Sequence, residues 1–223
     1  TLILSSFLTF MELNCENLFD TRHDSLKNDL EFLPDGSYRW TSYRYWAKLN
    51  HLGQEIVAQS NPIPDFVAMC EVENDSVMFD LTRRSLLRNA GYEYVMTSSP
   101  DERGIDVALL YQPASFALLH SHSIRIKPLP DTRPTRDILY VSGLIITGDT
   151  LHVLVVHAPS RRGGELASRP YRLHVADRLA AAVDSIYAES RDAKIIVAGD
   201  FNDYADSPAL KRLYQHHLIN ISH

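Results

Sequence analysis

Four short segments of this 223-residue chain place polar side chains directly after apolar runs. They read LNCENLFD (13–20), AMCEVEND (68–75), VVHAPSRRGG (155–164) and VAGDFND (197–203). Such apolar runs are typical of buried strands, and polar residues at the end of a buried strand project into a crevice rather than into the core. We therefore expect a candidate site where these four strand ends meet.

The first two segments carry oxygen ligands. Asn14, Glu16 and Asn17 follow the first run, and Glu71 ends the second. A charge at the end of a fully buried run needs a partner or a metal ion. Taken singly, each segment also fits a structural explanation, a turn for the first and an exposed strand-end acid for the second.

The other two segments add an imidazole, two guanidinium groups and further oxygens. His157 ends the run LHVLVV and precedes Arg161 and Arg162, whose guanidinium groups match the geometry of phosphate oxygens. Asp200 and Asn202 follow the fourth run. A lone strand-end histidine is more often structural than catalytic. The segment with Asp200 and Asn202 could also be a solvated turn, and the full pattern of a calcium-binding loop is absent from it.

Together the four segments indicate phosphoryl chemistry. Carboxylate and amide oxygens without cysteine suit a hard cation, Mg²⁺ or Mn²⁺, rather than zinc. Such a cation beside histidine and arginine neutralises charge on the oxygens of a phosphate, while a carboxylate positions water for in-line attack.

Composition narrows the class of protein. The chain is 45% hydrophobic, as in globular domains, and carries 22 Lys and Arg against 28 Asp and Glu, a net charge of −6. Bulk attraction to nucleic acid or anionic membranes is therefore excluded as the main binding principle, although a local basic patch is allowed. No apolar run reaches the roughly 18 residues of a membrane span. We expect Cys15 and Cys70, which lie in apolar runs, to be small core residues.

The hydrophobic pattern predicts strands separated by helices, with adjacent strands in the middle. A hairpin is expected at Gly148-Asp149, because glycine tolerates the positive φ of tight turns. This mixture indicates an α/β or α+β fold of two packed sheets, with helices on the outer faces. Strands are expected at 7–14, 65–71, 92–97, 106–111, 116–127, 138–147, 151–158 and 194–200, and helices at 43–60, 75–89, 166–189 and 208–216.

The order of these motifs resembles that of the endonuclease/exonuclease/phosphatase superfamily. That superfamily includes DNase I-like nucleases, abasic-site endonucleases, neutral sphingomyelinases and inositol phosphatases. The resemblance runs from about Phe10 to Asp203 and is strongest to a bacterial branch carrying NxENLFD, EVEN, RGIDVALLY, SRRGG and GDFND. It implies a DNase I-like four-layer α/β sandwich, two mixed sheets packed face to face with helices outside, as a single domain over 1–223.

The resemblance also implies ligands for Mg²⁺ or Mn²⁺ and a hydrogen bond that orients the histidine. Glu71 would be the main metal ligand, with Asn14 and Glu16 completing or orienting the metal shell. Asp106 matches the position where relatives keep an acid behind His157, so we expect these two side chains to be hydrogen-bonded.

The remaining implied roles concern the phosphate. His157 would bind the scissile phosphate or serve the leaving group, and Asp200 would hold the nucleophilic water. Asn202, Arg161 and Arg162 would contact phosphate oxygens.

The family pattern ends in a C-terminal strand carrying Ser/Gly-x-Asp-His. The sequence given ends at His223, and Ile221-Ser222-His223 imitates that motif only weakly. We expect a domain without this strand to be a poor catalyst, about a hundredfold or more below one that has it.

The expected function is that of a metal-dependent phosphoesterase, a phosphodiesterase or nuclease acting by in-line water attack on a phosphate ester, with nucleic acid among the candidate substrates. A phospholipid or sugar-phosphate phosphatase and an inactive binding module on the same fold remain alternatives. The oligomeric state and the compartment stay open, since both the bacterial cytoplasm and a secreted or periplasmic location after signal removal fit the sequence.

Overall fold

The computed structural model describes residues 7–130, 132–162 and 164–221. Ser222 and His223, on which part of the C-terminal motif comparison rests, lie outside them. The described elements, in chain order, are β1 (Phe10–Leu18), the 3-10 helix η1 (Leu30–Phe32), α1 (Ser42–Ala58), β2 (Phe66–Val72), α2 (Asp75–Arg83), the 3-10 helix η2 (Leu86–Asn89), β3 (Glu93–Met96), β4 (Asp106–Tyr111), β5 (Phe116–Ile124), β6 (Ile138–Ile145), β7 (Thr150–His157), α3 (Glu165–Glu189), β8 (Lys194–Asp200) and α4 (Pro208–Tyr214).

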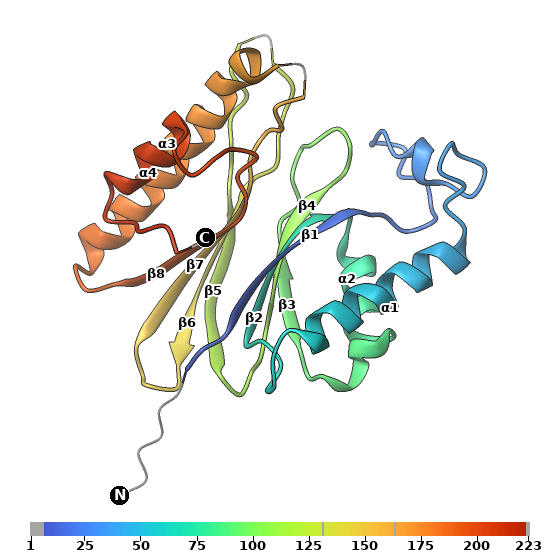
Figure 1. Cartoon of the computed structure of the whole chain (residues 1–223), viewed down its shortest axis with the longest axis horizontal. Coiled ribbons are helices and arrows are strands. Elements are labelled where there is room, and N and C mark those ends of the chain that lie inside the picture. The colour runs from blue at the N-terminus through green and yellow to red at the C-terminus, as the bar shows by residue number, and fades with distance from the viewer. Residues whose placement is uncertain (1–6, 131, 163, 222–223) are drawn as a thin grey trace, which may run out of the picture.

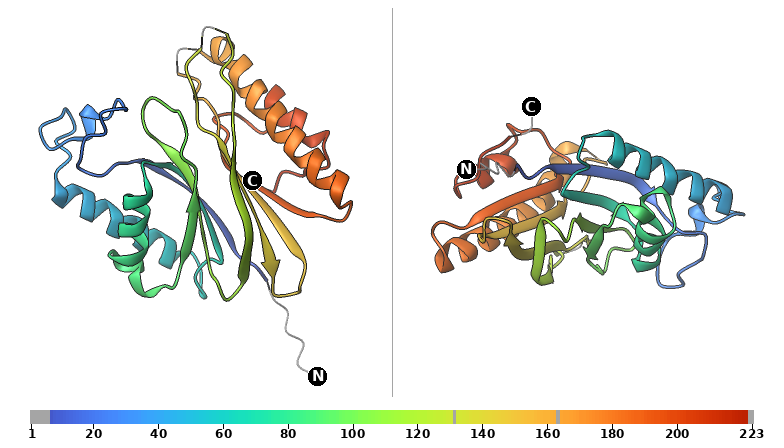
Figure 2. Two further views of the ribbon diagram at one scale, coloured as in Figure 1. Left: turned by 180° about the vertical axis from the view of Figure 1, so that it is seen from behind. Right: turned by 90° about the horizontal axis from the view of Figure 1, so that it is seen from below.

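Two mixed sheets form the centre of the protein. The first has the strand order β1-β2-β4-β3 and the second the order β5-β6-β7-β8. One pair in each is parallel, β1 with β2 and β7 with β8, and the other pairs are antiparallel. The sheets pack face to face, with α1 and α2 outside the first and α3 and α4 outside the second (Figures 1 and 2). The predicted four-layer α/β sandwich is therefore confirmed.

Strand β2 shows why the central strands appear in the sequence as continuous apolar runs. Phe66, Ala68 and Cys70 face the second sheet, where the Phe66 and Phe116 rings meet edge to face with centroids 5.1 Å apart. Val67 and Met69 pack on the other side with residues of α1 and α2. Both faces of the strand are covered, so alternation between polar and apolar residues is lost.

The predicted elements are present, and several of them begin or end at other residues than predicted. The helix predicted over 75–89 is divided: α2 ends at Arg83, and η2 begins after Ser85, whose side chain accepts a hydrogen bond from the Leu87 amide. The cap of α2 is Asn74, whose side-chain oxygen accepts from the Val77 amide, as asparagine at a helix N-terminus commonly does.

The first strand also differs from the prediction. It begins at Phe10 and continues to Leu18, four residues beyond the predicted end at Asn14, and its register with β2 shifts between Asn14 and Leu18. The polar residues that were expected to follow the strand therefore lie in its irregular last part. The predicted hairpin is confirmed, with Gly148 at φ +86° between antiparallel β6 and β7.

No helix among the described residues is long and apolar enough to cross a bilayer.

Candidate functional site

The second sheet presents its polar residues from a regular strand end. Strands β7 and β8 run parallel and in register until His157 lies opposite Asp200, and the Ala158 amide donates to the Asp200 carbonyl at 2.8 Å. Gly199 has φ +125°, and a Cβ added there would lie 1.9 Å from the Val156 carbonyl oxygen. Glycine at this position therefore lets the two backbones approach closely beside the site.

The first sheet presents its polar residues from two bulged strands. The register shifts between Asn14 and Leu18 in β1 and between Cys70 and Val72 in β2. Glu16, Asn17 and Glu71 have φ values of +49°, +66° and +62°. This left-handed conformation is uncommon and costly for residues with a side chain, and such residues cluster at functional sites. Bulges of this kind redirect a side chain out of the regular alternation.

Two cations and one amide hold the left-handed turn of β1 in place. The Asn14 side-chain oxygen accepts from the Glu16 amide at 2.8 Å, and Lys48 on α1 donates from Nζ to the carbonyls of Glu16 at 2.5 Å and Asn17 at 3.4 Å. The Arg103 guanidinium donates to the side-chain oxygen of Asn17. These contacts offset the strain of the turn.

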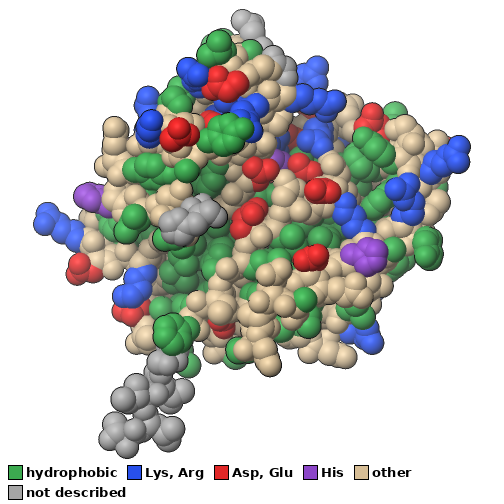
Figure 3. All heavy atoms as spheres, in the orientation of Figure 1, with side chains coloured by type: hydrophobic (Ala, Val, Ile, Leu, Met, Phe, Trp, Pro, Cys, Tyr) green, Lys and Arg blue, Asp and Glu red, His purple; other side chains and the backbone are tan. Residues whose placement is uncertain are grey.

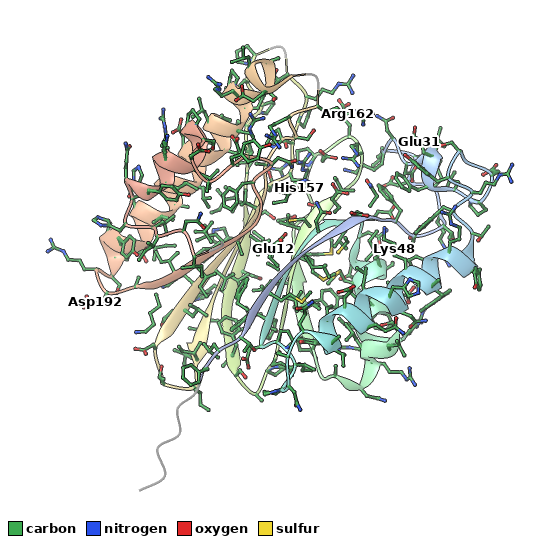
Figure 4. The ribbon with its side chains drawn as sticks, viewed as in Figure 1. Glu12, Glu31, Lys48, His157, Arg162 and Asp192 are labelled. Carbon is green, nitrogen blue, oxygen red and sulfur yellow. The ribbon has the colours of Figure 1, made fainter. Side chains whose placement is uncertain are left out.

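The two sets of strand ends meet between the sheets. His157 Nε2 lies 3.8 Å from Glu71 Oε1 and 3.9 Å from Asp200 Oδ2. Asn14 crosses from the first sheet to the second, donating from Nδ2 to Asp200 Oδ2 at 3.0 Å. Asp200 Oδ1 accepts from the Asn202 amide at 2.8 Å. The structure thus brings together residues from all four predicted strand ends, and Figure 4 labels His157 among them.

The central histidine is buried and neutral. Its side chain is 3% exposed, and its Nδ1 has no hydrogen-bond partner among the described residues. Burial, reinforced by the positive charges of Arg136 and Arg103, lowers the pKa of His157 to about 2. A neutral imidazole has one N–H donor, so it can donate a hydrogen bond to an anionic oxygen at the site.

The expected hydrogen bond between Asp106 and His157 is not formed, and that prediction is wrong for this structure. Asp106 Oδ1 instead accepts from the Thr97 and Ser99 hydroxyl groups and from the Ser99 amide at 3.0 Å. Asp106 lies in the first sheet and His157 in the second. The Asp106 carboxylate thus closes the loop between β3 and β4.

The oxygen donors fit a magnesium ion held by few protein ligands. The Glu71 side chain is 14% exposed, and its carboxylate makes no hydrogen bond among the described residues. No group of three acidic, cysteine or histidine residues that could hold a metal occurs in the described part of the chain. Mg²⁺ commonly uses one or two carboxylates and keeps several waters. Glu71 and Asp200, whose carboxylates each lie within 4 Å of His157 Nε2, are the residues that could hold such an ion.

The other predicted ligands take different positions. The Asn14 amide is hydrogen-bonded through both of its polar atoms, so it orients Asp200 and the turn at Glu16. Glu16 is exposed, and its backbone rather than its carboxylate is tied to Lys48. Asn202, at φ +50°, donates one side-chain amide hydrogen to the Ala158 carbonyl at 3.0 Å. Its other side-chain amide hydrogen has no partner among the described residues.

The two predicted arginines, Arg161 and Arg162, have different surroundings. The Arg161 guanidinium lies 4.3 Å above the centre of the Tyr204 ring. Arg162 borders a cavity of about 510 Å³ beside the site. Figure 3 shows acidic side chains near the middle of this face, with basic side chains above them.

Sequence reasoning missed three cations that surround the site, Lys48, Arg103 and Arg136. Arg103 begins the quoted motif RGIDVALLY, which was a usable signal. Lys48 lies in the middle of a helix, and no local pattern distinguishes it from a surface lysine.

Comparison with known proteins gives an independent identification of the fold. A sequence model of the Endonuclease/Exonuclease/phosphatase family matches residues 9–217. The structure is similar to the catalytic domain of human Nocturnin with a bound sulfate anion, at 21% identity and a TM-score of 0.63, over 92% of this chain and 68% of that one. No curated protein matches in a sequence search.

Two further structures share the fold. D. rerio TDP2 complexed with a single-strand DNA product has 17% identity and a TM-score of 0.59, over 93% of this chain and 64% of that one. An endonuclease/exonuclease/phosphatase family protein from Bacteroides thetaiotaomicron has 15% identity and a TM-score of 0.60, over 93% and 68%. The chain spans less than two thirds of the TDP2 structure. The motif order, the two-sheet fold and the match over 9–217 agree, and the chain belongs to the endonuclease/exonuclease/phosphatase family, whose members act on phosphate esters.

Proposed function

We propose that this protein is a metal-dependent phosphodiesterase. One observation carries the proposal: a buried neutral imidazole, His157, lies within 4 Å of two carboxylates supplied by different sheets, Glu71 and Asp200. A buried histidine beside two carboxylates that it does not hydrogen-bond adds little to stability. The same arrangement suits a phosphate, whose oxygens can accept from the imidazole while the carboxylates hold a cation and a water.

Mg²⁺ held at Glu71 would supply neutralisation of the charge on the phosphate oxygens. His157 would donate its N–H to one of those oxygens. Asp200, held by Asn14 and by the Asn202 amide, would accept a proton from the attacking water. The water oxygen bonds to phosphorus as the ester P–O bond breaks, and the leaving oxygen takes a proton from solvent. Asn202 would use its free amide hydrogen on the phosphate.

The test is hydrolysis of bis-p-nitrophenyl phosphate with and without Mg²⁺. We expect EDTA to abolish the reaction, and Glu71→Gln and Asp200→Asn each to lower kcat by at least about a hundredfold, the usual effect of losing a positioned acid or base. Mg²⁺ should also raise the melting temperature of the wild type but not of Glu71→Gln, because only a protein that binds the ion gains stability from it.

Asp192→Asn is the matched control, since it removes one carboxylate from a turn far from the site (Figure 4). This variant should behave as the wild type in both measurements. An unchanged response to Mg²⁺ in Glu71→Gln, or hydrolysis that persists in EDTA, would remove the metal-dependent mechanism.

A further inference from the structure

The cavity beside the site is unusually basic for this chain. Its walls carry Lys127, Arg103, Arg133, Arg136 and Arg162 against two acids, Asp101 and Glu102, whereas the whole chain has a net charge of −6. Arg136 is paired with Asp101 at 3.3 Å and Arg133 with Glu102 at 3.4 Å. Lys127 and Arg162 form no ion pair among the described residues, so the cavity keeps an excess of positive charge.

The wall of the cavity also contains buried donors without partners. Arg136 is 9% exposed, and its Nε has no hydrogen-bond partner among the described residues; the same is true of the Thr135 hydroxyl. Buried polar groups are normally paired, so unpaired ones at a cavity indicate a missing ligand or water.

The cavity lies next to the site and is joined to it by shared neighbours. Arg136 donates to the Ala158 carbonyl at 2.9 Å, and Asn202 donates to the same carbonyl at 3.0 Å. Arg136 and Arg103, which both border the cavity, are also the cations that act on His157. A group covalently attached to a phosphate at His157 can therefore extend into the cavity.

Beside its charged and hydroxyl-bearing residues, the cavity has aromatic and apolar surface. Tyr171 and His174 from α3 supply rings, and Ile126, Pro128 and Pro159 supply apolar surface. The His174 ring is fixed by a contact of 2.9 Å between its Nε2 and the Lys127 carbonyl. Flat rings beside cations are the combination that holds a nucleobase and its phosphate. A lipid headgroup would use the cations but not the rings.

We propose that this cavity binds a nucleotide unit of the substrate, with its flanking phosphate at Lys127 and Arg162 and its base against Tyr171 and His174. The proposal rests on the proposed function, since it assumes that the scissile phosphate lies at His157. It makes a nucleic acid, rather than a phospholipid or a sugar phosphate, the substrate class of this site.

The test measures binding of thymidine 3′,5′-bisphosphate by calorimetry in EDTA, so that no turnover occurs. We expect it to bind at least about tenfold more tightly than thymidine or glycerol 3-phosphate, because it alone offers both the ring and the phosphates. Lys127→Met and Tyr171→Ala should each weaken it by about tenfold.

The control variants are Lys211→Met on α4 and Tyr43→Ala on α1, both exposed and away from the cavity. They should bind the bisphosphate as the wild type does. Equal binding by the two cavity variants, or glycerol 3-phosphate binding as tightly as the bisphosphate, would overturn the proposal. Because the assay needs no hydrolysis, it reports on the cavity even if the wild type fails to cleave bis-p-nitrophenyl phosphate, which would count against the proposed function alone.

Discussion

The two sheets deliver their functional side chains in different ways. In the second sheet, β7 and β8 stay in register until His157 faces Asp200, and the site follows directly from regular pairing. In the first sheet, β1 and β2 lose their register, and Glu16, Asn17 and Glu71 take left-handed backbone conformations. Regular pairing thus places His157 without backbone strain. The left-handed turn at Glu16 and Asn17 is instead held by hydrogen bonds from Lys48 and Arg103.

The backbone conformations near the site differ in how much they lower the free energy of unfolding. Left-handed residues other than glycine cost on the order of 1–3 kcal/mol each and persist only when their surroundings hold them. The first sheet carries three such residues at the site. In the second sheet, Gly199 at φ +125° meets a requirement of both space and backbone conformation, and Asn202, which follows β8, takes φ +50°.

The largest effect is expected from Gly199→Ala. The new Cβ would lie 1.9 Å from the Val156 carbonyl oxygen, so β7 and β8 would have to separate. Adding the cost of a left-handed alanine, we expect the free energy of unfolding to fall by about 3 kcal/mol or more, measured by urea denaturation.

Gly148→Ala separates space from strain. Gly148 has φ +86°, but a Cβ there would meet no atom within 4 Å. Its substitution should cost only about 1 kcal/mol, the strain alone. If Gly199→Ala and Gly148→Ala lowered the free energy of unfolding equally, the close approach of β7 and β8 at Gly199 would not contribute to the cost of the substitution.

The sequence predicted the regular half of the molecule better than the strained half. Strands β4 and β8 were predicted residue for residue, because each apolar run is bounded by turn residues. The bulges were not predicted, since Glu71 is not a residue type that favours positive φ. The Asp106 interaction was assigned wrongly because a carboxylate's partner depends on side chains, here Thr97 and Ser99, that the motif does not specify.

A further prediction asks whether the Asp106 carboxylate stabilises its own sheet or orients His157 in the other sheet. Asp106→Asn should lower the free energy of unfolding by about 2 kcal/mol, because buried donors from Thr97 and Ser99 lose a charged acceptor. The pH dependence of kcat should stay that of the wild type. A loss of kcat of about a hundredfold in a folded variant would instead make Asp106 a positioning residue for His157.

The smallest effect tests the strain in the first sheet directly. Glu71→Gly should be more stable than Glu71→Ala by about 1 kcal/mol in EDTA, because glycine accepts φ +62° without cost. The matched pair is Glu93→Gly and Glu93→Ala in the extended strand β3, where glycine should be the less stable by about 0.5–1 kcal/mol. The same order of stability at both positions would mean that the conformation of Glu71 stores no strain.

The hydrogen bond from Asn14 to Asp200 joins residues 186 positions apart. During synthesis, the ribosome adds residues at about 5–20 per second, so roughly 10–40 s pass between the appearance of these two side chains. For the middle part of that interval the nascent chain contains Glu71 but neither His157 nor Asp200, the two groups that lie near it in the folded protein. If Asp200 acts as we propose, the growing polypeptide cannot hydrolyse a phosphate ester before β8 has joined β7.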